Sequence, residues 1–349
     1  MSAPTFDAAM LNWGRLILDG LPFADVREAE TREAGETWLD FWTAKADQYE
    51  SMAEQALAAG HTVSGGEWLW LASLCCQYAQ FLWFDERRKG VQRRKASLYA
   101  RAAPHLRPPA RPFSVSVGLV DVPCFLRLPE HAADEPVACA ILLGGLESTK
   151  EESYAFENLL LDRGIATCTF DGPGQGELLE KVALSPDFER YTSAVLDRLI
   201  ENDAIDPARV GVVGRSLGGC YALRSASTDE RLKACISWGG FVTVDWNAEP
   251  AHDRASWRYV SKVTTDEEAR ARVEKSLDTR PVLGQLRCPT YFLHGALDEV
   301  PLGQIDVLRE FAVNADLTVI VEPHGDHCCH NLGPAPRLRM ADWLAERLS

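Results

Sequence analysis

A serine between glycines is the residue of this chain whose surroundings point most directly to chemistry. The stretch Gly214-Arg-Ser216-Leu-Gly218 follows a short run of β-branched residues and precedes a segment that favours a helix. This is the G-x-S-x-G pattern in its required order of strand, sharp turn and helix. The turn presents the serine hydroxyl for nucleophilic attack, and the N–H of Leu217 is predicted to stabilise an oxyanion. The alternative is a glycine-rich turn that happens to contain a serine.

An acid and a histidine come later in the chain, in that order. Asp298 and His327 each follow a predicted strand, which is where open α/β sheets place their sites. A serine hydroxyl becomes a useful nucleophile when an imidazole removes its proton, and a carboxylate fixes the tautomer of that imidazole and stabilises its cation. The sequence therefore predicts a catalytic triad of Ser216, Asp298 and His327.

Neighbouring residues compete for two of these roles. Glu299 is the rival of Asp298, which is preferred because it comes directly after a His-Gly-Ala-Leu turn. His324 and His330 are the rivals of His327, which is preferred for its Gly-Asp-His loop. The same loop holds two cysteines, and a zinc site is the alternative use of its side chains. Structural zinc takes paired ligand sets or a helical H-E-x-x-H, so the sequence predicts no metal site.

A second oxyanion donor is expected where an earlier buried strand, 137–143, ends in two glycines. Small residues there let the backbone approach a substrate carbonyl, so Leu146 or Gly145 is the predicted donor. An ordinary Gly-Gly turn is the alternative. The next glycine-rich loop, within 164–176, lacks the Lys-Ser/Thr of a phosphate-binding loop and is expected to shape the floor of the pocket.

Four segments together resemble one group of α/β-hydrolases. The group includes 2,6-dihydroxypseudooxynicotine hydrolase, FrsA-like esterases and fungal hydrolases that shorten heptaketide pigment precursors. The segments are Gly144–Glu152, Phe170–Glu177, Gly214–Gly219 and Gly325–Asn331, and the resemblance extends over about residues 35–345. It implies a serine hydrolase fold with a helical cap and, in the best-matched members, cleavage of a carbon–carbon bond next to an aryl ketone. It also suggests a homodimer.

The same resemblance implies an additional acidic residue beyond the strand that follows the serine. Asp245 and Glu249 are the two candidates, and the sequence leaves the choice between them open. The alternative is that either carboxyl lies on the protein surface and has no part in the reaction.

The elements around the site suggest two domains. Residues 1–108 are predicted as an N-terminal helical domain, because apolar and aromatic residues recur at helical spacing in three successive runs. Residues 108–112 are the expected linker, and 109–349 form the α/β-hydrolase core with a mostly parallel central sheet. An antiparallel hairpin over 113–129 opens that core. A charged, helix-prone insertion over about 242–286 is expected to form a lid over the serine.

Composition narrows the class of protein. The 349 residues are 46% hydrophobic, which suits a hydrolase core with an added helical region. A formal net charge of −15 opposes binding to nucleic acid and to anionic membranes. The sequence contains neither a signal-peptide pattern nor a run long enough for a membrane span. Its 10 cysteines lie mostly in apolar strands or adjacent pairs, so reduced thiols and a cytoplasmic location are expected.

Three functions are compatible with these residues. The leading hypothesis is hydrolysis of a carbon–carbon bond next to the carbonyl of a small aromatic or polyketide-like ketone, without a cofactor. A carboxylic ester or lactone hydrolase would use the same triad without needing to protonate a leaving carbon. The third alternative is a non-catalytic α/β-hydrolase scaffold that binds a ligand, and the order Ser-Asp-His argues against it.

Overall fold

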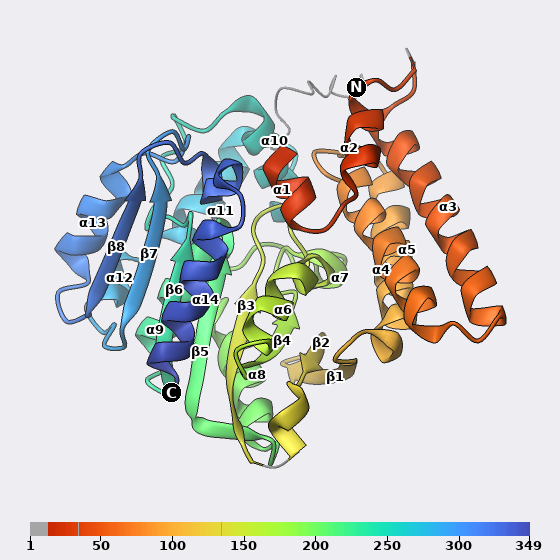
Figure 1. The fold of residues 1–349 in the computed structure, drawn as a ribbon. Helices are drawn as coiled ribbons and strands as arrows, with labels where there is room; N and C mark the ends of the chain where they lie inside the picture. The colour runs from red at the N-terminus through yellow and green to blue at the C-terminus, as the bar shows by residue number, and fades with distance from the viewer. Residues whose placement is uncertain (1–12, 34, 134) are drawn as a thin grey trace.

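An eight-stranded sheet forms the centre of the protein (Figure 1). The structure is a computed structural model that describes residues 13–33, 35–133 and 135–349. The strand order is β1-β2-β4-β3-β5-β6-β7-β8; β2 is antiparallel to β1 and β4, and the other neighbours are parallel. The strands are β1 Ala110–Val117, β2 Val120–Arg127, β3 Val137–Leu143, β4 Ala166–Phe170, β5 Ile205–Arg215, β6 Leu232–Trp238, β7 Thr290–Gly295 and β8 Leu317–Glu322. The mostly parallel sheet of an α/β-hydrolase is therefore confirmed.

Helices cover both faces of this sheet, which explains why its central strands are apolar throughout. All seven residues of β3 are buried, and alternate side chains enter two different cores. One core is shared with α8 (Glu189–Ile200) and α9 (Leu217–Thr228), and the other with α6 (Tyr154–Leu161) and α14 (Ala335–Arg347). This region also contains the helices α7 Gly176–Leu179 and α13 Gly303–Phe311, and the short 3₁₀ helices η3 Glu130–Ala133, η4 Lys150–Ser153 and η5 His327–Leu332.

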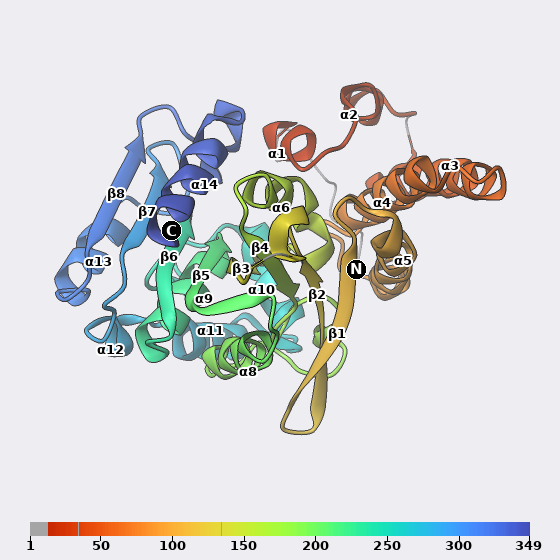
Figure 2. The same cartoon turned by 60° about the horizontal axis from the view of Figure 1, so that its bottom comes forward.

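The N-terminal residues form helices with a core of their own. Three of them, α3 (Trp38–Ala58), α4 (Thr62–Ala79) and α5 (Arg87–Ala102), pack side by side and lead into η2 (Ala103–His105). The aromatic residues of this region belong mainly to that core: Trp42 and Tyr99 have no exposed surface. Two shorter helices precede them, α1 (Trp13–Leu18) and α2 (Phe23–Glu30), and α1 lies apart from the three-helix group, beside the main body of the protein (Figures 1 and 2).

The start of one strand differs from the sequence-based expectation. Strand β1 begins at Ala110, inside the stretch expected to be a linker. Pro112 is compatible with a strand here because β1 is at the edge of the sheet, where a missing N–H is tolerated. The insertion after β6 contains α10 (Ala251–Ser261), α11 (Asp266–Leu277) and α12 (Arg280–Leu283). Apolar residues of all three helices join the core that also holds α8 and α9, so the insertion is anchored by packing.

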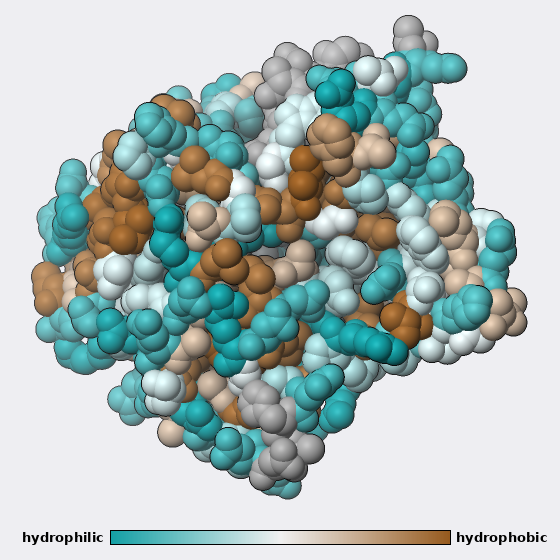
Figure 3. All heavy atoms as spheres, viewed as in Figure 1, coloured by the Kyte–Doolittle hydropathy of each residue, from teal (hydrophilic) through white to brown (hydrophobic). Residues whose placement is uncertain are grey.

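The face of the molecule seen in Figure 3 is mostly hydrophilic, with apolar side chains over β8 and near α1. Val321 of β8 and Ile17 of α1 are each 41% exposed. Among the described residues, no helix combines the length and the apolar character that a membrane crossing needs.

Candidate active site

Ser216 lies on a strained turn between β5 and α9. Its φ of 55° and ψ of −121° are unusual for a residue with a side chain, and its N–H donates to the carbonyl of Trp238 at 2.8 Å. The flanking glycines are required by the close approach of the backbone. A Cβ at Gly214 would lie 1.8 Å from the carbonyl oxygen of Gly218, and one at Gly218 would lie 2.2 Å from that of Leu143. The G-x-S-x-G pattern thus produces the tight elbow that the sequence predicts.

The three residues of the predicted triad are joined by hydrogen bonds. The Nε2 atom of His327 is 2.8 Å from the Oγ of Ser216, and its Nδ1 is 2.9 and 3.0 Å from the two carboxylate oxygens of Asp298. Asp298 lies in the loop after β7, and His327 lies after β8 at the start of η5. The carboxyl ends of neighbouring parallel strands therefore bring together residues that are far apart in the sequence.

Asp298 and His327 stabilise each other's charged form. Burial by itself raises the pKa of Asp298, but the neighbouring His327 and the backbone N–H of Val300 outweigh it and hold that pKa below its usual range. Burial by itself lowers the pKa of His327, yet the Cys328 sulfur and the Asp298 carboxylate raise it well above its usual range. The arrangement favours a carboxylate beside an imidazole that readily accepts a proton.

The competing residues take other positions. His324 is exposed, and its carbonyl accepts a hydrogen bond from Asn331. His330 is buried against the ring of Trp238, and burial together with Arg215 and Arg337 lowers its pKa well below the usual range. The loop also contains a feature that the sequence did not signal. Cys328 and Cys329 both have positive φ, 59° and 55°, immediately after His327.

The residues predicted as oxyanion donors surround the serine. Leu217, Gly145 and Leu146 line the same cavity as Ser216, and a Cβ added to Gly145 would lie 3.2 Å from the Cβ of Ser216. The side-chain amide of Gln175 donates to the carbonyls of Gly144 and Gly145, at 2.7 and 3.1 Å. In a trans peptide the N–H points opposite to the preceding carbonyl, so the N–H groups of Gly145 and Leu146 point away from Gln175.

This contact corrects the role expected for the glycine-rich loop after β4. Gln175 and its loop lie behind the Gly144–Leu146 segment, and among the described residues none of 171–176 lines the cavity. The loop supports the segment of the predicted oxyanion donors instead of forming the pocket floor.

The cavity in front of Ser216 has a volume of about 230 Å³ and is enclosed from two sides. Arg15 and Leu16 of α1 and Tyr78 of α4 contribute one wall. Phe241, in the loop after β6, and Trp257, in the insertion that follows, also line the cavity. Both the N-terminal helices and the insertion therefore border the serine. Aromatic rings on both sides suit an aromatic ligand.

A buried ion network, which sequence reasoning missed, connects α1 to the elbow. Arg215 donates to both carboxylate oxygens of Asp19 at 3.1 and 3.0 Å and also pairs with Glu152. Asp19 further accepts from Arg337 at 2.7 Å and from the hydroxyl of Tyr78 at 2.8 Å. Arg215 is the variable residue of the G-x-S-x-G pattern, so the sequence motif itself carries no signal for this role.

The two acids proposed from the resemblance both line the cavity but differ in environment. Asp245 is exposed, and its carboxylate accepts from the backbone N–H of Asn247 at 3.0 Å. Glu249 accepts from the indole N–H of Trp257 at 2.7 Å, and burial, together with nearby carboxylates, raises its pKa. Glu249 is the more enclosed of the two.

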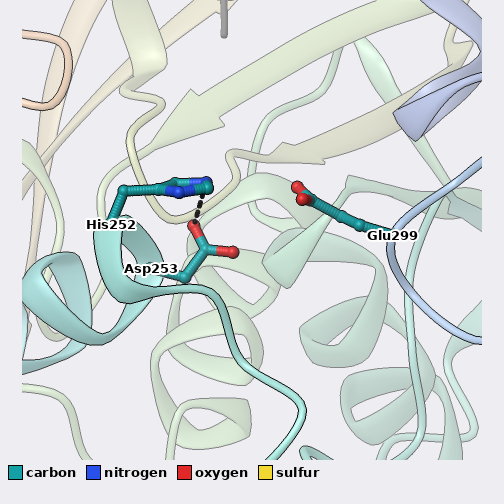
Figure 4. A group of neighbouring side chains, drawn as sticks. All are labelled: His252, Asp253 and Glu299. Atoms are coloured by element: carbon teal, nitrogen blue, oxygen red, sulfur yellow. Dashed lines mark ion pairs between the residues drawn. The ribbon is translucent and has the colours of Figure 1, made fainter. Parts of the chain in front are cut away.

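A third acid, Asp253, was not singled out by the sequence. It lies in the first turn of α10 and lines the cavity with His252 and with Glu299, the rival of Asp298 (Figure 4). Burial raises the pKa of Asp253 to about 7, and the carboxylates of Glu299 and Glu249 contribute to this increase. An aspartate in a helical, charged segment gives no signal in the sequence, because its place in the cavity depends on how the insertion folds.

Within residues 13–33, 35–133 and 135–349, two groups of side chains have the ligand types of a metal site. One is His252, Asp253 and Glu299, whose ligand atoms lie within 4.8 Å of one another. The other is Glu151, Asp171 and Glu177, and there the ammonium of Lys150 already pairs with all three carboxylates, at 2.6, 3.0 and 2.5 Å. Lys150 thus takes the position of a cation in the second group.

A nucleophile elbow at the carboxyl edge of a mostly parallel sheet, within hydrogen-bond reach of a histidine and an aspartate, defines the α/β-hydrolase class. The chain belongs to the family of FrsA-like esterases, whose family pattern matches residues 32–315. It is 54% identical over 340 residues to 2,6-dihydropseudooxynicotine hydrolase of Paenarthrobacter nicotinovorans. The aligned part covers 97% of this chain and 92% of that protein. The protein is therefore a hydrolase.

Other comparisons agree with this class. The crystal structure of 2,6-dihydroxy-pseudo-oxynicotine hydrolase superimposes with a TM-score of 0.93, covering 97% of this chain and 96% of that chain at 54% identity. The hydrolase acrC of Aspergillus aculeatus is 33% identical over 226 residues, which are 58% of this chain and 53% of that protein. The structure of AbyA5 has a TM-score of 0.70 at 19% identity, covers 92% of this chain and 93% of its own, and shares the fold.

Proposed function

We propose that the protein is a serine hydrolase that cleaves the carbon–carbon bond next to the carbonyl of a small aromatic or polyketide-like ketone. The observation that carries the proposal is the hydrogen-bonded series Ser216–His327–Asp298 at a partly aromatic cavity. The 54% identity to 2,6-dihydropseudooxynicotine hydrolase supports the choice of substrate class. The chemistry requires no cofactor.

The reaction begins when His327 removes the hydroxyl proton of Ser216, whose oxygen attacks the ketone carbonyl. The N–H of Leu217 and that of Leu146 or Gly145 stabilise the oxyanion that forms. Collapse of this intermediate expels the ring, which requires a proton at the leaving carbon. Water activated by His327 then hydrolyses the acyl-enzyme and releases a carboxylic acid.

The proposal includes an acid that assists departure of the ring. The two candidates of the sequence differ in environment: Glu249 is the more enclosed and has a raised pKa. Asp245 is exposed and contacts its own loop. An ester or lactone hydrolase is the second candidate function, because the same triad cleaves esters and the family is named for an esterase.

Product analysis on matched substrates tests the proposal. A dihydroxyphenyl alkyl ketone and the para-nitrophenyl ester of the same acyl chain pass through an identical acyl-enzyme, so they differ in the leaving group alone. We expect the wild-type protein to release the free dihydroxybenzene from the ketone, and Ser216→Ala to lose both activities by about 10⁴-fold or more. Ester cleavage without ketone cleavage, across a panel of such ketones, would favour the esterase. Absence of both, together with no fluorophosphonate labelling of Ser216, would favour a non-catalytic scaffold.

We also propose a cytoplasmic homodimer that acts on a small molecule. All 10 cysteines are unpaired thiols, which fits a reducing compartment. The dimer rests on the family resemblance, and light scattering coupled to size-exclusion chromatography would test it: a mass near 38.6 kDa would contradict it.

A further inference from the structure

Asp253 occupies a position in the cavity that the reaction described above does not yet use. Its side chain is 26% exposed, and Figure 4 shows its carboxylate next to His252, with Glu299 pointing toward both. Within the part of the chain that the structure describes, the carboxylate pairs with His252 alone, at 3.5 Å between Nε2 and Oδ1. A carboxyl without strong donors and with acidic neighbours tends to keep its proton.

The groups around Asp253 favour the protonated form. Those that face it are Glu299 from the loop after β7, Glu249 from the loop before α10, Glu147 from the loop after β3, His327 from the loop after β8 and His252 from its own helix. Burial is the largest cause that raises its pKa to about 7, Glu299 and Glu249 follow, and His327 opposes them. The carboxyl therefore holds its proton up to a higher pH than an ordinary aspartate does.

The reaction needs such a group. When the tetrahedral intermediate collapses, the electron pair of the broken bond remains on a ring carbon, and this carbon must gain a proton. We propose that Asp253, in its protonated form, is the acid that delivers this proton to the leaving ring carbon; the inference rests on the proposed function. Ser216 and Asp253 line the same cavity of about 230 Å³, so a ketone attacked by Ser216 is bound in the cavity that also holds the Asp253 carboxyl.

The step balances with the groups present. As the carbonyl of the acyl-enzyme forms, the bond between carbonyl carbon and ring carbon breaks, the O–H bond of Asp253 breaks and a C–H bond forms on the ring. The ring leaves as a neutral arene, Asp253 becomes a carboxylate, and His327 still carries the proton taken from Ser216. Transfer of that proton to Asp253 restores both groups before His327 activates the water for deacylation.

Neither of the two acids named from the sequence meets the same requirements. The pKa of Glu249 is also raised by burial, but its carboxylate already accepts a hydrogen bond from the indole N–H of Trp257, and its charge contributes to the raised pKa of Asp253. Asp245 is exposed. The pKa of Asp298 is lowered, whereas that of Asp253 is raised. Such opposite shifts are the usual basis for assigning different roles to two carboxyls of one site.

The test compares ketone and ester cleavage in Asp253→Asn, which keeps the size of the side chain. With the hydroxyaryl ketone that the wild type cleaves fastest, we expect kcat to fall by about 10²-fold, whereas the matched para-nitrophenyl ester should change by less than about threefold. Asp253→Glu should recover part of the ketone activity. Glu267→Gln, which removes an exposed acid of α11, is the control and should change neither rate.

The dependence of the ketone rate on pH gives a second measurement. In the wild type, the ratio of ketone kcat to ester kcat should decline above about pH 7 as Asp253 loses its proton, because the protonation of His327 affects both substrates alike. Equal losses on both substrates in Asp253→Asn, or unchanged ketone cleavage, would overturn the inference. A larger selective loss in Glu249→Gln than in Asp253→Asn would overturn it as well. Failure of the proposed function is distinguishable, because the wild type itself would then leave every ketone intact.

Discussion

Two aspartates lie near the same imidazole and have opposite pKa shifts. Asp298 has a fully buried side chain, yet its pKa is lowered; Asp253 is 26% exposed, yet its pKa is raised to about 7. Burial disfavours the charge of both. The difference comes from their partners: Asp298 accepts from His327 and from the N–H of Val300, whereas Asp253 is surrounded by Glu299 and Glu249. The environment therefore assigns one aspartate to orient a base and the other to hold a proton.

Removing the imidazole of His327 should have the largest effect on kcat. His327→Ala is expected to reduce kcat for both ketone and ester by about 10⁴-fold or more, because one base serves both half-reactions. His324→Ala, which alters an exposed residue of the same loop, is the matched control and should be mild, as should His330→Ala in protein that stays folded. Steady-state kinetics on the matched substrates measure this, and an inactive His324→Ala would show that the wrong histidine was assigned.

Asp298→Asn should separate the roles of the two aspartates. We expect a loss approaching about 10⁴-fold on both substrates, since an amide no longer holds the tautomer that His327 needs. Asp253→Asn, by contrast, should spare the ester. The comparison would fail if the two variants showed the same ratio of ketone to ester activity, because the aspartates would then have no distinct roles.

The fall of the ester rate at low pH tests the effect of Asp298 on His327. His327 must be neutral to accept the serine proton, and its pKa is raised, so the rate should fall about tenfold per pH unit below that pKa. Removing the charge of Asp298 removes one cause of the increase, so the residual activity of Asp298→Asn should fall only at lower pH. An acid limb at the same pH in variant and wild type would contradict the assigned coupling.

The sequence predicts one side of this comparison and not the other. Ser216, Asp298 and His327 each follow a strand, and local patterns of apolar residues and glycines locate strands and turns well. The sheet, the opening hairpin and the three longest N-terminal helices were predictable for the same reason. The start of β1 could not be predicted, because Pro112 favours a linker unless the strand lies at the edge of a sheet.

Tertiary packing decides the rest. Asp253 lies one turn before Trp257 on the same face of α10, and the packing of Trp257 and Val260 into the core places this face at the cavity. The network around Arg215 joins residues up to 318 positions apart, and no local sequence pattern predicts it. The positive φ of Cys328 and Cys329 is equally hidden, since such conformations are expected at glycine and not at cysteine.

The smallest expected effect is on stability, and it tests the proton on Asp253 without any substrate. The folded protein binds this proton with a pKa of about 7, whereas an unfolded aspartate has a pKa of 3.8, so ionisation opposes folding and wild-type stability is lost as pH rises from about 4 to about 7. Asn cannot ionise and escapes this loss. The free energy of unfolding of Asp253→Asn, relative to wild type, should therefore increase by roughly 2–3 kcal/mol between pH 5 and pH 8. Urea denaturation at both pH values measures it, with Glu267→Gln expected to show no such change. A difference that does not vary with pH would mean that Asp253 is already ionised at pH 5, and its role as the proton donor would be lost.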